Sequence, residues 1–146
     1  MRAAALALTL LAAGCAKAPR DRVSIRADRL LYSPAMSSTV GIGLTPSYEP
    51  AAGGPAPGGP AVVFHWRAEG GRFLRWAPPD YKVTALGTDV RNGGEKIFWS
   101  YDPADGGSGK PQPAVSLAVE DAKTGAPLAA ARLRLRWKEG AVEVFP

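Results

Sequence analysis

Cysteine and histidine are nearly absent from this chain of 146 residues, which contains one of each. A single cysteine excludes an intramolecular disulfide. A Ser-His-Asp arrangement would have to use His65, which lies within a predicted strand between Phe64 and Trp66, and no serine lies in a nucleophile motif. We therefore expect no enzyme and interpret His65 as a structural residue that faces solvent or is covered by the sheet.

Long hydrophobic runs are also scarce. The one run of small and aliphatic residues, 3–13, is roughly half as long as the ~20 residues that cross a bilayer. It follows the positive start Met1-Arg2 and ends before Gly14-Cys15, which is the pattern of a secretory signal. We predict a signal peptide at residues 1–14.

The end of this run has a recognisable form. Leu10-Leu11-Ala12-Ala13-Gly14-Cys15 resembles the lipobox of bacterial lipoproteins, with Ala12 where a leucine is usual. The resemblance implies that Cys15 is the lipid-modified first residue of the mature chain, which would explain a lone cysteine in an exported protein. An ordinary secretory signal with a coincidental cysteine is the alternative.

Basic residues concentrate next to this position. Without Arg2, the chain carries 17 basic and 13 acidic side chains, and most of the excess lies between residues 17 and 29. The rest of the chain is nearly neutral, which argues against a nucleic acid partner. We expect residues 15–22 to form a basic tether on anionic headgroups, where each basic residue contributes about 1 kcal/mol; a merely solubilising tether is the alternative.

Short apolar stretches separated by Gly/Pro turns make up the remainder, and no helix of useful length is predicted after residue 14. Residues 23–146 therefore predict one all-β domain of about seven strands, a two-layer antiparallel sandwich or a small barrel. Its longest connection is the Gly/Pro-rich loop 48–60. The predicted strand segments are 23–25, 39–44, 61–76 (a hairpin), 81–86, 95–101, 114–120 and 130–138.

Two hairpins are predicted in detail. In Ala61–Trp76, a turn at Glu69-Gly70 would pair Trp66 with Phe73, although it would also oppose Arg67 to Arg72. The register of this hairpin is therefore left open. At the end of the chain, a turn at Glu139-Gly140 would pair Trp137 with Val142, Leu135 with Val144 and Arg136 with Glu143, which matches the apolar and charged faces.

Several segments within residues 61–138 share a family pattern. They are Phe64-His65-Trp66, Gly70 to Leu74, Lys96 to Ser100, Ala114 to Asp121, and Thr124-Gly125. This succession resembles the bacterial Ig-like and PKD-like repeat, in which a tryptophan-bearing strand leads to a Gly-aromatic turn and a second Trp-containing strand. The resemblance implies an extracytoplasmic Ig-like β-sandwich that spaces, displays or binds, and it carries over no catalytic residue.

Metal sites receive little support from the sequence. One histidine and a cysteine taken up by lipid are too few ligands for zinc. Asp102 and Asp105 could offer oxygen to calcium, but the spacing of a dedicated calcium loop is missing. We expect no metal and no cofactor.

Two surfaces are candidates for binding. Trp66, Trp99 and Trp137 are predicted to lie in the core, which leaves Trp76 as the exposed tryptophan for sugar stacking. The second candidate is a basic row on the outer side of the last strand, which would bind an anionic polymer or only protect a sheet edge. We expect Glu143, and also Glu120, to offset part of its charge. The row consists of Arg132, Arg134, Arg136 and Lys138.

The sequence therefore predicts a non-enzymatic, lipid-anchored and extracytoplasmic module of the bacterial cell envelope. It would be held on the membrane through Cys15, as a monomer, and engage an envelope protein or an anionic polymer. A carbohydrate- or peptidoglycan-binding module is the alternative. An exposed coplanar pair of aromatic rings would favour the sugar, and a flat apolar or basic patch on one sheet would favour the protein or polymer.

Overall fold

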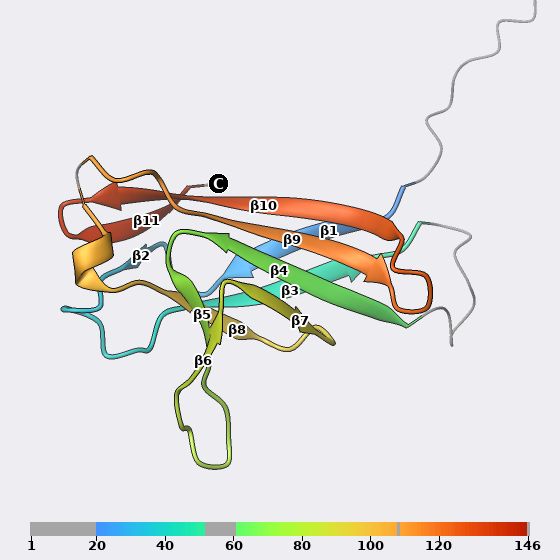
Figure 1. The fold of residues 1–146 in the computed structure, drawn as a ribbon, viewed down its shortest axis with the longest axis horizontal. Helices are drawn as coiled ribbons and strands as arrows, with labels where there is room; N and C mark the ends of the chain where they lie inside the picture. The colour runs from blue at the N-terminus through green and yellow to red at the C-terminus, as the bar shows by residue number, and fades with distance from the viewer. Residues whose placement is uncertain (1–19, 52–60, 108, 146) are drawn as a thin grey trace, which may run out of the picture.

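The computed structural model describes residues 20–51, 61–107 and 109–145. The predicted signal peptide, Cys15, most of the 15–22 tether and most of the 48–60 loop lie outside these ranges. The described residues form an all-β structure of two antiparallel sheets packed as a sandwich (Figure 1), as predicted. Within them, no helix has the length and apolar character needed to cross a membrane.

One layer is a five-stranded sheet. Its strand order is β1-β3-β8-β5-β6, and every pair is antiparallel. The strands are β1 (Arg22–Ala27), β3 (Ile42–Glu49), β5 (Arg72–Arg75), β6 (Thr84–Gly87) and β8 (Ile97–Ser100). The connection between β5 and β6 extends away from the body of the sandwich (Figure 1).

The other layer is a six-stranded sheet with the order β2-β11-β10-β9-β4-β7. Its strands are β2 (Leu31–Tyr32), β4 (Val62–Glu69), β7 (Asp89–Asn92), β9 (Ala114–Asp121), β10 (Pro127–Lys138) and β11 (Ala141–Phe145). A short 3₁₀ turn, η1 (Pro103–Asp105), follows β8. The described residues form eleven strands, more than the predicted seven or so; β2 and β7, the two short edge strands of this sheet, lie outside the predicted strand segments.

Alternating side chains fill the space between the sheets. The largest side chains with no exposed area include Trp66 from β4 and Trp99 from β8, as predicted. Val115, Leu117 and Val119 of β9 are buried, whereas the intervening residues of β9 are only partly buried. Trp137 is half-buried and packs edge-on against Tyr101, with ring centroids 4.7 Å apart.

The hairpin predicted at residues 61–76 is wrong. β4 pairs with β7 and β9 in the six-stranded sheet, whereas β5 pairs with β6 and β8 in the five-stranded sheet. Gly70 and Gly71, with φ angles of 78° and 70°, turn the chain from one layer to the other. Trp66 therefore meets Phe73 across the core and not as a neighbour within one sheet.

The terminal hairpin is confirmed residue by residue. Leu135 pairs with Val144, Arg136 with Glu143 and Trp137 with Val142. Glu139 and Gly140 have φ angles of 48° and 79°, as the two positive φ values of a type I′ turn require. Here the apolar pattern and the turn chemistry agree, so they determine one register.

Candidate binding face

The outer face of the six-stranded sheet carries most of the charged side chains that the sequence singled out. Because residues paired across an antiparallel sheet point to the same side, the register places them in rows. One row runs Arg91, His65, Ala118 and Ala130 from β7 to β10, and the next runs Asp89, Arg67, Ser116 and Arg132. The small residues in the middle of both rows come from β9.

A shallow groove follows these small residues. It has a volume of about 410 Å³, and Ser116 and Ala118 of β9 form its floor. His65 and Arg67 of β4 stand on one side and Arg132 of β10 on the other. The groove exists because β9 places small side chains between two strands with long ones.

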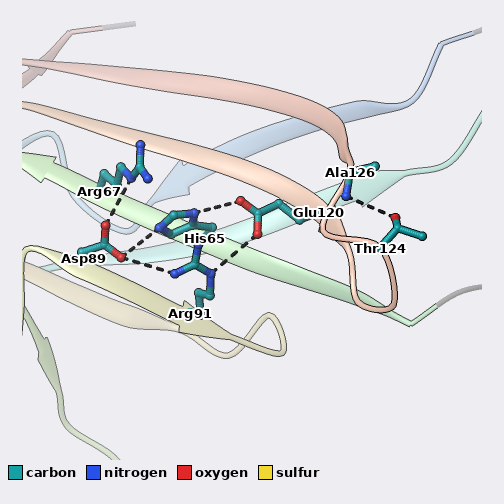
Figure 2. A network of polar contacts seen from close by, with 7 residues as sticks. All are labelled: His65, Arg67, Asp89, Arg91, Glu120, Thr124 and Ala126. Carbon is teal, nitrogen blue, oxygen red and sulfur yellow. Dashed lines mark hydrogen bonds and ion pairs between the residues drawn. The ribbon is translucent and has the colours of Figure 1, made fainter.

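His65 is the centre of a charged cluster beside this groove. Its side chain is only 4% exposed, although it lies on the outer face. Nδ1 is 2.9 Å from Oε1 of Glu120, and Nε2 is 2.9 Å from Oδ1 of Asp89. Figure 2 shows the imidazole held between the two carboxylates, with Arg91 beside it. Of the two positions predicted for His65, facing solvent or covered, the structure has the covered one, and the side chains that enclose the ring come from the neighbouring strands.

The arginines complete the cluster. Arg91 lies 3.6 Å from Oε2 of Glu120 through Nε and 3.8 Å from Oδ1 of Asp89 through Nη1. Arg67 donates a hydrogen bond of 3.2 Å from Nε to Oδ2 of Asp89. Hydrogen bonding to His65 lowers the pKa of both Asp89 and Glu120, so these two groups are ionised acceptors near neutral pH.

The basic row lies on this face as predicted, but most of its charge is offset. Arg132 donates from Nη1 and Nη2 to both carboxylate oxygens of Glu69, at 2.7 and 2.9 Å. Glu143 pairs with Arg136 at 2.5 Å and with Lys138 at 3.6 Å, which confirms the offset expected from that residue.

The offset expected from Glu120 is wrong. Glu120 is engaged by His65 and Arg91, and Glu69 takes its place opposite Arg132. Ser116 and Ala114 of β9 are small enough for the Arg132 side chain to cross that strand and reach β4. Sequence reasoning missed Glu69 because it is 63 residues from Arg132 and becomes a neighbour only through the β4–β9 pairing.

Arg134 differs from the rest of the row. Within the described residues, no carboxylate lies within 4 Å of it, and its guanidinium lies over the Phe145 ring at 5.5 Å from the centroid. Arg136 lies over the same ring at 5.1 Å. Phe145 is 43% exposed and borders a second groove of about 270 Å³ on this face.

Trp76 lies elsewhere, on the outer face of the five-stranded sheet. It is half-buried, and its ring packs edge-on against Phe98 at 5.7 Å and Tyr81 at 5.4 Å between centroids. The more exposed aromatic of this cluster is Tyr81, at 54%. The prediction of an exposed Trp76 is therefore only partly right, because Phe98 and Tyr81 cover part of its ring.

Metal-ligating side chains do not gather in residues 20–51, 61–107 and 109–145, where no group of three or more is positioned around one point. Asp102, which the sequence raised for calcium, accepts hydrogen bonds from Arg72 on both oxygens. The same contact lowers the pKa of Asp102.

Comparison with known proteins gives no match to a family model, to a curated protein or to a solved structure.

Proposed function

We propose that this protein is a non-enzymatic, lipid-anchored binding module of the bacterial cell envelope that engages another envelope protein. The lipobox-like segment that ends at Cys15 supports the anchor and the extracytoplasmic location. The observation that carries the binding role is the groove of about 410 Å³ on the outer face of the six-stranded sheet. Its floor is made of small side chains, which leave room for a partner's side chains, and its rim is made of charged side chains held by hydrogen bonds, as the polar rim of a protein interface is.

An anionic polymer is less well supported as the main ligand. Three of the four basic residues in the 132–138 row face a carboxylate, so little uncompensated charge remains to attract a polyanion. Arg134 alone favours that ligand.

The sugar-binding alternative rests on exposed aromatic rings. Trp76 and Tyr81 are adjacent, but their planes meet at 63°, so they do not form the coplanar platform on which a sugar would stack. Trp66 and Trp99 are fully buried. The protein partner therefore remains the better supported proposal.

The anchor and the binding role can be tested together in cells. Metabolic labelling with a fatty-acid analogue should mark the wild-type protein and not Cys15→Ser, which should also leave the membrane fraction. A photo-crosslinking amino acid at Ser116, on the groove floor, should yield a discrete adduct, whereas one at Lys123, in the exposed β9–β10 turn, should not. Equal labelling of Cys15→Ser would contradict the anchor, and no Ser116-dependent adduct would contradict the binding role.

A further inference from the structure

β1 is the outermost strand of the five-stranded sheet, and within the described residues nothing pairs with its second edge. Its partner on the other side is β3, over the full length from Arg22 opposite Glu49 to Ala27 opposite Leu44. The inner side of β1 packs over β10 of the other sheet (Figure 1).

The hydrogen-bond pattern shows which backbone groups of β1 point outward. Asp28, which continues the β1 register, donates its N–H to the carbonyl of Gly43 at 2.9 Å. Hydrogen bonding alternates along an antiparallel pair, so Arg22, Ser24 and Arg26 bond to β3 as Asp28 does. Pro46, which has no N–H, lies opposite Ile25, in agreement with a position where no bond is made. The N–H and C=O groups of Val23, Ile25 and Ala27 therefore face the open edge.

A groove runs along the same edge. Its volume is about 500 Å³, and it lies between β1 and the β10–β11 part of the other sheet. The half-buried side chains of Val23, Ile25 and Ala27 line it from one side. Leu133 and Val144 line it from the other, and Leu30, which is 68% exposed, stands at its rim. Within the described residues, backbone groups that no strand pairs with and an apolar groove thus lie side by side.

The charges on β1 indicate which kind of strand could pair with its open edge. Arg22 and Arg26 are exposed on the outer side of the strand, and no carboxylate in the described ranges forms an ion pair with either. Pairing with β1 of a second copy would bring four arginines together on one face of the joined sheets, which disfavours that dimer. A strand with acidic residues at the outward positions and apolar residues at the inward ones complements both sides.

We propose that β1 is a docking edge for an extended peptide segment of alternating apolar and acidic residues, which adds as a further strand to the five-stranded sheet. Backbone hydrogen bonds to Val23, Ile25 and Ala27 supply affinity, and the groove and the arginines supply specificity. This inference rests on the proposed role in binding a protein and names the form that the partner takes.

The test uses the full chain in detergent and fluorescence anisotropy. The probe is a labelled peptide of about eight residues that alternates valine and glutamate, which is long enough to span β1; its control replaces glutamate with lysine. The wild-type protein should bind the acidic peptide at least about tenfold more tightly than the basic one, since two arginines are matched in one case and opposed in the other. Equal binding of the two peptides, or no binding of either, would overturn the proposal.

Two variants examine the edge itself. Ile25→Pro removes an N–H that points away from β3, so it should abolish peptide binding without removing a sheet hydrogen bond, and circular dichroism checks that it folds. Arg22→Glu with Arg26→Glu should reverse the preference towards the basic peptide. Arg75→Glu with Lys82→Glu, which makes the same charge change on exposed residues away from β1, should leave the preference unchanged.

The cellular experiment separates this inference from the proposed function. If the Ser116 adduct persists in Ile25→Pro, and the acidic peptide binds Ile25→Pro as it binds the wild type, strand addition is wrong while the binding role stands. If the wild type binds the peptide but gives no Ser116 adduct, the proposed function at the groove fails, while the β1 edge stands as a peptide-binding site.

Discussion

Trp66 and Phe73 pack edge-to-face across the core, with ring centroids 6.2 Å apart, although only six residues separate them and they belong to different sheets. Both side chains are fully buried. The contact joins the two layers at the point where the chain crosses between them. It makes Trp66 a central element of the fold.

Trp66→Ala should therefore be strongly destabilising. Truncating a buried tryptophan typically costs about 3 to 5 kcal/mol through lost burial and the cavity left behind. Trp76→Ala, at a half-buried position outside the core, should cost clearly less. Urea titration of both variants gives the comparison, and a loss below about 1 kcal/mol for Trp66→Ala would show that the side chain is not in the core.

Gly71→Ala should be more damaging than Gly125→Ala, although the two glycines have nearly the same φ, 70° and 71°. A Cβ at position 71 would lie 2.5 Å from the carbonyl oxygen of Ser100 and 2.6 Å from the Trp99 ring, whereas at position 125 nothing lies within 4 Å. Both variants carry the cost of a left-handed alanine, about 1 kcal/mol. Thermal unfolding should show a larger loss for Gly71→Ala; equal losses would mean that the corner can shift.

Acid should weaken the cluster around His65. In the folded protein the pKa values of Asp89 and Glu120 lie below their usual range because each accepts a hydrogen bond from His65. Since the folded values are the lower ones, the stability contributed is complete above the unfolded-state values of about 3.9 and 4.3, and it is lost as the pH falls through the folded-state values.

Denaturant titrations from about pH 5.5 down to about pH 3 measure this loss. The double variant Asp89→Asn with Glu120→Gln should show a flatter dependence on pH over the same interval, because the two groups no longer titrate. Parallel curves for the wild type and the double variant would show that the cluster contributes nothing to the acid response.

Removing carboxylates from the basic row should increase its attraction to polyanions. On a heparin column the wild type should elute at low salt, and Glu69→Gln with Glu143→Gln should elute later because Arg132, Arg136 and Lys138 are no longer offset. Arg134→Ser should elute earlier than the wild type. Identical elution of all three proteins would mean that this row does not attract polyanions.

Local pattern was enough to predict the strand faces and the terminal hairpin. Along β10 from Ala131 to Lys138, apolar and basic residues alternate without a break, and a slip of one residue would expose Leu133 and Leu135 while burying arginines. The turn at Glu139-Gly140 adds a second constraint that agrees with the first. The sequence therefore determined the positions of the basic row as well as its partner Glu143.

Contacts between segments far apart in the sequence could not be predicted from local pattern. Gly70-Gly71 suits a tight hairpin as well as a crossing between layers, and the choice depends on which strands compete for β4 and β5. The partners of His65 lie 24 and 55 residues away, and Glu69 lies 63 residues from Arg132. The His65 contacts form only once β4 lies between β7 and β9, and the Glu69–Arg132 contact forms only once β9 lies between β4 and β10.

The place of β4 in its sheet also bears on how the protein is made. Both of its neighbours, β7 and β9, come later in the chain, and β9 begins 45 residues after β4 ends. A chain that emerges from its N-terminus therefore presents β4 with both edges unpaired until β7 is out, and with one edge unpaired until residue 121 is out. Any chain truncated before β9 would leave that edge of β4 exposed. The sandwich can therefore be completed only after the C-terminal third of the chain has been made.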